Sequence, residues 1–279
     1  MKNKALIIII LVAIMTLFIA SFILPFFSRY DIYEQNASLK YAKPSEEHIL
    51  GNDYLGRDML VRTCRAIKNS ILIAVFSIPV SVLLGIIYGA YAGYASASVE
   101  KAMTMTMNVL ESTSEFLLAI LLMVVLTSLE IKFFDGGIFG IVITLIVLFW
   151  IEIARVVKNE TKKIVNNDYV LYSELKNAQF GHIFLFHILP GIRGIAIVMT
   201  VQKISSAIFL EAFLSYIGIG IQPPNPSLGI MINEGIKSIR TYPHLLFFPA
   251  IALVAVILLF NILGELLKFE NKVGLIHEK

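Results

Sequence analysis

Six long apolar stretches, separated by polar segments, divide this chain of 279 residues. Each stretch reaches the length of about 20 apolar residues that an α-helix needs to cross a bilayer. The pattern therefore predicts six transmembrane helices, at about residues 5–27, 71–94, 110–129, 137–157, 192–217 and 245–267. The first stretch is longer than the apolar core of a signal peptide and no convincing cleavage site follows it, so we expect a retained helix.

The polar segments set the expected organisation. We expect an N-terminal helix at residues 1–27, an extracellular loop at 28–70, and a core of five helices at 71–279 with a polar segment at 158–190. The loop is too short for a separate domain with a core of its own. Short connections near residues 95–103 and 129–136 predict antiparallel helix neighbours, and no internal repeat is visible.

Composition agrees with a membrane protein, since 57% of the residues are hydrophobic, only 15% are charged and the mean hydropathy is +0.80. Soluble domains carry about 25% charged residues. The net charge of +3 indicates no nucleic-acid partner.

The single cysteine, Cys64, excludes an internal disulfide, and we expect it to be a small residue packed between helices. No metal site is expected, because His48 reads as a solvated loop histidine.

The distribution of Lys and Arg bears on orientation. With six spans both termini lie on the same side, and a dense basic cluster at residues 155–176 favours the cytoplasm for that side. Against this, Arg57, Arg62, Arg65 and Lys68 would lie outside, although the same loop also carries six acidic residues. The expectation is a multi-pass protein with both termini in the cytoplasm.

The segment 168–190 is polar, with apolar residues at helical spacing. Asp168 is suited to cap a first short helix, and Asn177 and Gly181 both tolerate a bend. A second apolar stretch is expected to end at Pro190. Such an amphipathic hairpin either docks into a groove on a partner protein or lies passively on the lipid surface.

Residues 207–235 combine an apolar helix with an irregular, Gly- and Pro-rich loop. Glu211 within that helix, with Ser215 one turn later, is typical of a helix that packs against others beside a translocation path. We expect Glu211 to bond to a neighbouring group, with Lys203 or Ser215 as candidates.

Glu111 and Glu115 lie one helical turn apart at the start of the predicted third helix. On one continuous helix they would share a face, line the path and prefer cationic cargo. The alternative is that they sit at the cytoplasmic water boundary. Glu152 is expected to pair with Arg155 or a neighbouring helix.

Two outer segments read as turns or caps. Gly51, Asp53, Gly56, Arg57 and Asp58 predict turns that lead into a helix, with Asp58 near its start. They either contact an extracellular binding protein or fold back over the helix ends. The same alternatives hold for a rigid, gate-like loop that contains three further candidates, Gln222, Pro223 and Pro224.

Four blocks of residues, in order and at consistent spacing, carry a family resemblance. The chain resembles the second permease subunit of the oligopeptide, dipeptide and nickel importers of the ATP-binding cassette (ABC) class. The blocks are residues 48–58; Trp150 with Ala154, Arg155 and Lys158; Tyr169-Val170 with residues 187–190; and Glu211 to Gly235, continued by Phe260-Asn261 and Gly264-Glu265.

The resemblance implies an all-α membrane protein with six transmembrane helices, a type I ABC importer permease fold and a cytoplasmic coupling helix. The coupling residues would be Tyr169, Val170, Leu171, Leu175, Asn177, Ala178 and Gly181. The chain departs from the family where Leu171-Tyr172-Ser173 replaces Glu-Ala-Ala and Asn177 replaces glycine. That departure leaves the docking strength and the choice of ATPase open.

The resemblance also implies partners and cargo. These are a second permease subunit, one or two ATPase subunits that carry ATP and Mg, and an extracellular substrate-binding protein, in the plasma membrane of a prokaryote. The chain itself would bind no cofactor, since it has no phosphate-binding Gly-rich loop followed by Lys-Ser or Lys-Thr. The cargo would be oligopeptides or dipeptides, with nickel or metallophore complexes as the alternative.

Two other functional classes compete with the interpretation as an ABC importer permease. An intramembrane hydrolase would need a nucleophile or zinc motif that this sequence lacks. An ion-coupled secondary transporter or channel would show inverted repeats, which are not visible, although Glu111 and Glu115 keep that hypothesis open. Dependence on ATP hydrolysis by separate subunits would discriminate between them.

Overall fold

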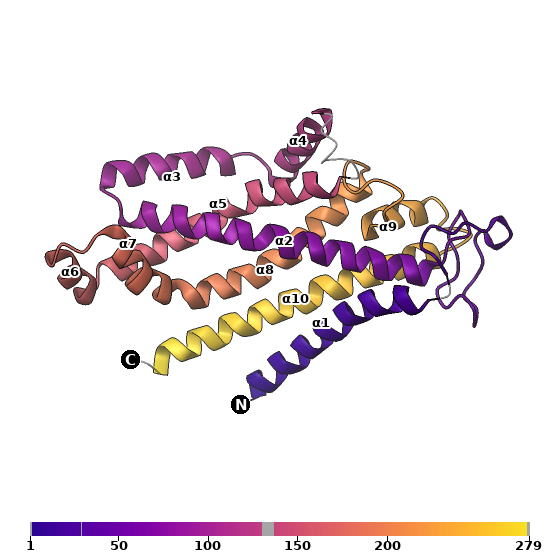
Figure 1. The fold of residues 1–279 in the computed structure, drawn as a ribbon, viewed down its shortest axis with the longest axis horizontal. Coiled ribbons are helices and arrows are strands. Elements are labelled where there is room, and N and C mark those ends of the chain that lie inside the picture. Colours follow the sequence, from indigo (N-terminus) through magenta and orange to yellow (C-terminus); the bar gives the residue numbers. More distant parts are fainter. Residues whose placement is uncertain (1, 29, 130–136, 278–279) are drawn as a thin grey trace.

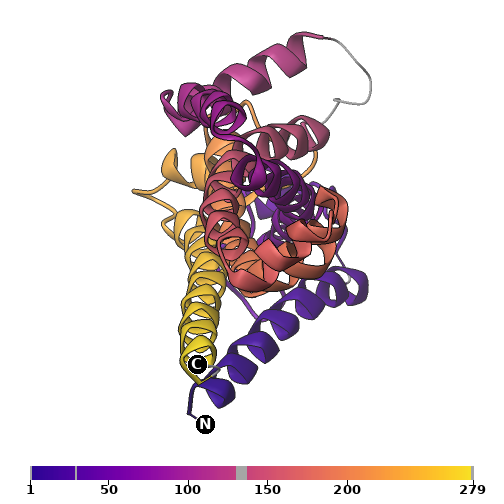
Figure 2. The same ribbon diagram turned by 90° about the vertical axis from the view of Figure 1, so that its left-hand side faces the viewer.

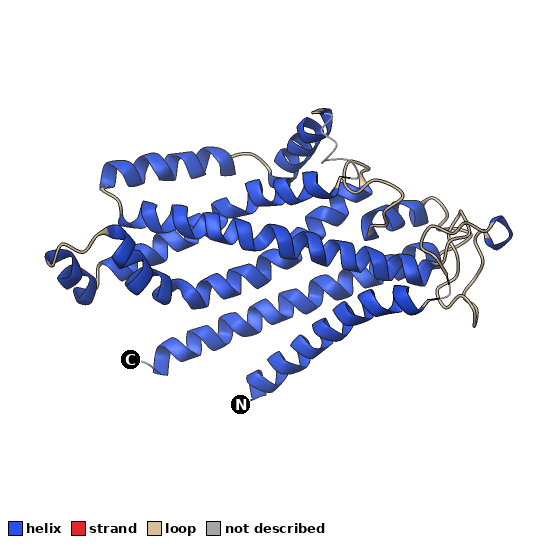
Figure 3. Ribbon diagram, in the orientation of Figure 1, coloured by secondary structure: helices blue, strands red, loops and turns tan. Residues whose placement is uncertain are grey.

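The computed structural model describes residues 2–28, 30–129 and 137–277, and within these ranges it contains helices and one isolated bridge between Asn52 and Asp58 but no strand. Figure 3 shows long helices side by side, with most of the loops gathered at one end. The helices are α1 (Lys2–Phe27), η1 (Ala37–Leu39), α2 (Met59–Tyr94), α3 (Ala97–Glu111), α4 (Glu115–Ser128), α5 (Ile138–Val165), α6 (Asp168–Leu175), α7 (Phe180–Ile183), η3 (Phe184–Ile188), α8 (Leu189–Tyr216), α9 (Leu228–Ile236) and α10 (His244–His277).

Five helical stretches are long and apolar enough to cross a membrane: α1, α2, α5, the run Phe180–Tyr216 and α10. A sixth crossing exists only if α3 and α4, which meet at an angle of 83°, form one broken span. The prediction of a single straight helix at 110–129 was therefore wrong. Ser112 bonds back to the carbonyl of Val109 at 2.7 Å, and such local side-chain bonds compete with helix continuation.

Two other predicted boundaries change. Helix α2 begins at Met59, so the loop expected to reach residue 70 ends at Asp58, and Arg62, Arg65 and Lys68 are helical. The physical reason is the cap, because the Asp58 carboxylate accepts a bond of 2.9 Å from the backbone N–H of Val61. At the other end, the connection expected at 95–103 shrinks to two residues between α2 and α3.

The two ends of the bundle differ in character. In Figure 1 the hairpin of α6 and α7 lies at one end, and the N- and C-termini lie toward the same end. The loop between α1 and α2 gathers beside α9 at the opposite end. Figure 2, seen from the hairpin end, shows α1 and α10 converging at their terminal ends, while α4 leaves the bundle on the other side.

The closest helix pair in the core is α2 with α5. Gly85, Gly89 and Gly93 recur at every fourth position of α2, on the face that meets α5. A β-carbon at Gly89 would collide with the carbonyl oxygen of Ala154. Small residues at this spacing let two helix backbones approach closely, so this stripe determines how tightly the core packs.

Contrary to the expectation from the sequence, Pro190 does not end a helix. It is the second residue of α8 and lies inside a continuous helical run. The preceding π-helical turn, η3, passes directly into α8, and the Leu189 N–H bonds to the Phe184 carbonyl. The fifth predicted span therefore begins at Phe180 rather than near residue 192.

Candidate functional site

The hairpin of α6 and α7 has the bend that the sequence predicts. Asn177 adopts a left-handed conformation with φ of 57°, and its N–H donates to the Glu174 carbonyl at 2.8 Å. The Ala178 N–H closes the turn on the Ser173 carbonyl at 3.1 Å. Asp168 is not the helix cap, because Asn167 holds that position, without a capping bond from its side chain, and Asp168 is already the first helical residue.

One side of the hairpin is fixed to the bundle. Val170 is fully buried and belongs to an apolar cluster with Val157 of α5, Ile183 of α7 and Ile192 of α8. The Ser173 hydroxyl and His187 Nε2 lie 3.1 Å apart and add a polar bond to η3. A displacement of α6 would therefore be passed directly to two spanning helices.

The opposite side of the hairpin is apolar and open. Leu175 is 83% exposed, and Tyr169, Leu171 and Tyr172 are exposed as well. Gly181 has open space where a β-carbon would lie. The sequence-predicted coupling residues thus divide into two groups. Val170 is buried and Ala178 packs against the same apolar cluster, whereas the other five are exposed and available for contact.

The loop between α1 and α2, which we call the outer loop, folds back over the helix ends. Gly51 and Gly56 both adopt positive φ, at 74° and 79°, which glycine does without steric cost. The Gly56 N–H bonds to the Asp53 carbonyl at 3.0 Å, and Asn52 pairs with Asp58 in the isolated bridge. The predicted turns are confirmed.

His48 is not a solvated loop residue, contrary to the prediction. It is only 6% exposed, its Nδ1 lies 2.8 Å from Asp58 Oδ2, and its ring lies 4.4 Å from that of Tyr30. Asp58 therefore joins the loop to the first turn of α2 with both carboxylate oxygens.

Four charged side chains form a group that we call the outer ion network. It consists of Asp53, Arg57 and Arg62, which are buried, and Glu234, which is half-buried. Asp53 Oδ2 accepts from Arg57 Nε at 2.6 Å and also from Arg62 Nη1. Arg62 Nη1 further donates to Glu234 Oε2 at 3.2 Å. Two cations balance two anions, so the network ties the loop to α2 and α9 without a net charge.

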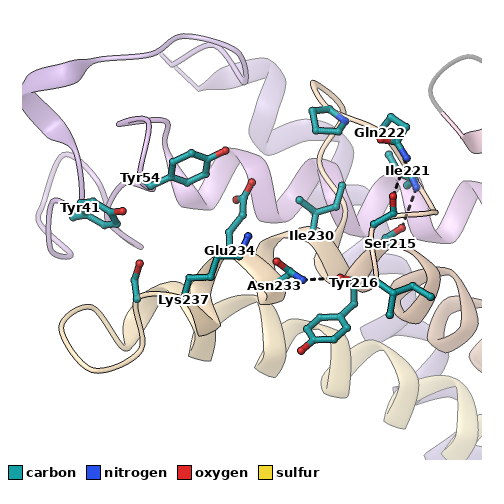
Figure 4. A pocket seen from close by; sticks show the side chains of 14 residues that line it. Tyr41, Tyr54, Ser215, Tyr216, Ile221, Gln222, Ile230, Asn233, Glu234 and Lys237 are labelled. Carbon is teal, nitrogen blue, oxygen red and sulfur yellow. Dashed lines mark hydrogen bonds between the residues drawn. The ribbon is translucent and has the colours of Figure 1, made fainter.

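A cavity of about 390 Å³ lies beside this network, between the outer loop and the α8–α9 connection. Figure 4 shows Tyr54, Glu234 and Gln222 around it, together with Asn233, whose amide donates to the Tyr216 carbonyl at 2.7 Å. Partial burial and the Glu234 carboxylate raise the pKa of Tyr54 above its ordinary value. Gln222 and Pro223 line the cavity, which places the predicted gate loop on its wall.

Glu211 is fully buried rather than on a path surface, and three hydroxyl groups surround it. Its Oε1 accepts from Ser215 at 2.9 Å and from Ser227 at 2.8 Å, and its Oε2 accepts from Ser70 at 2.5 Å. The carboxylate joins α2, α8 and the start of α9. Of the two partners considered, Ser215 is confirmed and Lys203 was wrong, because Lys203 pairs with Glu152.

Glu111 and Glu115 do not share a helix face, because the chain bends between them. Glu111 ends α3 and binds Arg155 of α5, which also donates to Asn108 at 2.9 Å. Glu115 begins α4 and lines a separate cavity beside α8 and α10. The two carboxylates therefore have different surroundings, and whether either lines the path stays a prediction.

Two polar contacts had no role in the sequence reasoning: Glu234 with Arg62, and Asn261 with Ser205. Glu152 pairs with Lys203 of α8, so of its two expected partners the one on a neighbouring helix is confirmed. Asn261 Oδ1 accepts from the Ser205 hydroxyl at 2.6 Å. The available signal was the rarity of such side chains in apolar helices, where each requires a partner. Which of these side chains contact each other across the helices can be determined only from the folded structure.

Comparison with known proteins agrees with this architecture. Residues 65–269 match the family described as the binding-protein-dependent transport system inner membrane component. The chain belongs to this family. It is an all-α, multi-pass membrane permease of a transport system.

Several curated relatives span most of the chain. An oligopeptide transport system permease protein of Bacillus subtilis (strain 168) is 35% identical over 93% of this chain and 81% of the relative. A dipeptide transport system permease protein of the same organism is 34% identical over 89% and 76%. An oligopeptide permease protein of Haemophilus influenzae is 30% identical over 95% and 83%.

Proposed function

We propose that this chain forms half of the translocation path of an ATP-driven ABC importer for oligopeptides or dipeptides. The peptide cargo is inferred from the relatives, which are permease proteins of oligopeptide and dipeptide transport systems. The observation that carries the coupling mechanism is the hairpin, with Val170 buried in the bundle and Leu175 presented outward. An element of this kind is suited to receive a push from a partner protein and to transmit it.

In this proposal the exposed apolar side of α6 docks into a cleft of a cytoplasmic ATPase subunit. Closure of the ATPase pair displaces α6, and the packing of Val170 against α5 and α8 moves those helices between inward- and outward-facing states. ATP and Mg bind to the ATPase subunits. A second permease subunit supplies the other half of the path.

The orientation follows from the same element. The hairpin end, with both termini and the basic residues Lys158, Lys162, Lys163 and Lys176, faces the cytoplasm, in agreement with the positive-inside rule. The outer loop and α9 then face outward, where the substrate-binding protein delivers its cargo. The plasma membrane of a prokaryote is the corresponding location.

The direct test is reconstitution. The tagged chain is purified from its native membrane, its copurifying proteins are identified by mass spectrometry, and the complex is placed in liposomes. We expect a second permease and one or two ATPases, and uptake of a labelled tripeptide that requires both ATP and the binding protein. ATP-independent uptake, or a complex without an ATPase, would contradict the proposal.

Asn177→Pro is expected to uncouple ATP hydrolysis from transport. Proline holds φ near −65°, whereas Asn177 has φ of 57° and its N–H donates to Glu174, so the turn cannot form. Uptake per ATP hydrolysed should fall at least about tenfold, since a loss of about 1.4 kcal/mol in docking already has that effect.

The matched control is Asn177→Gly, which adopts positive φ freely and keeps the N–H donor. It should retain coupling close to that of the unaltered complex. Both variants are first checked for assembly with the partner subunits. Normal coupling in an assembled Asn177→Pro complex would remove the hairpin from the mechanism.

A further inference from the structure

A second cavity, of about 300 Å³, lies between α4, α8 and α10. Its polar lining consists of Glu115, Ser205, Ser206 and Asn261, and its aromatic lining includes Phe116 and Phe209. No part of the outer loop or the coupling hairpin lines it. It is therefore distinct from the sites described above.

The cavity lies deep along the bundle. With a rise of about 1.5 Å per residue, Ser205 lies about 24 Å along α8 from Leu189 and about 17 Å from Tyr216. A carboxylate and a carboxamide at such depth are costly against lipid, so they face protein or a water-filled path. A cavity with this lining is therefore suited to face the translocation path rather than lipid.

The charge around the cavity is negative. Glu115 lies close enough to Glu152 and Lys203 for their charges to act on its carboxylate. Lys203 is already engaged, because it forms an ion pair with Glu152 and its Nζ lies 5.0 Å from the centre of the Phe149 ring. Among the described residues, no hydrogen bond or ion pair occupies the Glu115 carboxylate, which leaves one uncompensated negative charge.

The remaining lining complements a protonated primary amine. An ammonium group has three N–H donors and needs acceptors at close range. Glu115 supplies a carboxylate, Ser206 a hydroxyl and Asn261 an amide oxygen with a lone pair that Ser205 does not use. Phe116 and Phe209, whose ring centres are 6.3 Å apart, add aromatic surface that attracts a cation.

We propose that this cavity is a transit site for a protonated primary amine of the cargo, either the amino terminus of a peptide or a lysine side chain. This inference rests on the proposed function, because it concerns what the importer admits. Glu115 is its specificity-determining residue, since it contributes the negative charge that is not engaged elsewhere.

The test uses the complete importer in liposomes, with Glu115→Gln and the partial-rescue variant Glu115→Asp. The matched control is Glu160→Gln, at a partly exposed position of α5 where the carboxylate pairs with Lys163 one turn away. Three probes are compared: Ala-Ala-Ala, N-acetyl-Ala-Ala-Ala and N-acetyl-Ala-Lys-Ala. Loading of each probe onto the binding protein is measured directly, and uptake is compared at saturating loading. For each probe, the uptake rate of the variant is divided by that of the unaltered complex. This ratio reports the effect of the permease separately from that of the binding protein.

If the cavity binds the amino terminus, Glu115→Gln slows Ala-Ala-Ala about tenfold and leaves both acetylated probes unchanged, since a bond to a charged group is worth about 1.5 kcal/mol or more. If it binds a lysine side chain, only N-acetyl-Ala-Lys-Ala is slowed. In either case Glu115→Asp recovers part of the rate and Glu160→Gln changes none.

Equal slowing of all three probes, or of none, would overturn the inference while leaving the importer intact. Failure of the unaltered complex to import any probe would instead overturn the proposed function. Assembly and ATP hydrolysis of each variant are measured in the same preparation, so that a folding defect is recognised as such.

Discussion

Replacing Arg62 by methionine is expected to lower the midpoint of thermal unfolding of the purified permease complex by about 10 °C. Arg62 is 3% exposed and donates to both Asp53 and Glu234. Methionine fills similar space but leaves the buried Asp53 carboxylate and the half-buried Glu234 carboxylate with Arg57 as their remaining cation in the network. Breaking a buried ion pair in this way costs about 3–5 kcal/mol, which gives a shift of this size.

The matched control is Lys40→Met, which removes the same charge from an exposed position in the loop between α1 and α2. It should shift the midpoint by less than about 2 °C. Asp53→Asn combined with Arg62→Met should destabilise by less than the sum of the single changes, because the two side chains are direct partners. Equal effects of Arg62→Met and Lys40→Met would show that the network adds no stability.

Gly89→Leu is expected to prevent the folded permease from accumulating. A β-carbon at this position meets the backbone carbonyl of Ala154, which cannot rotate away as a side chain can. Overpacking a well-packed core costs about 1–3 kcal/mol even where side chains adjust, so the cost here should exceed about 3 kcal/mol. The measurement is the yield of monodisperse protein in mild detergent and the unfolding midpoint of what remains.

Gly181→Leu is the matched control, since it makes the same chemical change where a β-carbon meets open space. Leucine is also the better helix former, so this variant should be at least as stable as the unaltered protein. Gly89→Ala should fall between the two. Equal yields for Gly89→Leu and Gly181→Leu would disprove the close approach of α2 and α5.

Much of the architecture was accessible from hydrophobic patterning alone. The first, fourth and sixth predicted helices correspond to α1, α5 and α10, because a bilayer demands long apolar helices and the sequence displays them directly. The stripe of Gly85, Gly89 and Gly93 is also visible in the sequence, and its spacing of four residues is the recognised signal for close helix packing. It was not among the predicted features.

The errors concern local competition and long-range partners. Three consecutive hydroxyl residues, at 112–114, interrupt a helix that looked continuous, and this separates Glu111 from Glu115. His48 looked solvated because its partner, Asp58, acquires its position only when the loop turns at Gly51 and Gly56. In both cases the local sequence pattern suggested one structure, and a contact that the pattern does not display produced another.

Sequence by itself determined that this is an all-α membrane protein of a recognisable permease family, with a bend at Asn177 and a cap at Asp58. These features depend on apolar length, backbone preference and short-range bonds, all of which are encoded locally. Only the tertiary structure decided which buried charges meet. The pairs Arg62–Glu234 and Lys203–Glu152 and the hydroxyls around Glu211 join distant helices, because a charge in an apolar bundle is stabilised by the partner that folding brings to it. The residues that line the cavity at Glu115 likewise come from three helices that only the fold brings together.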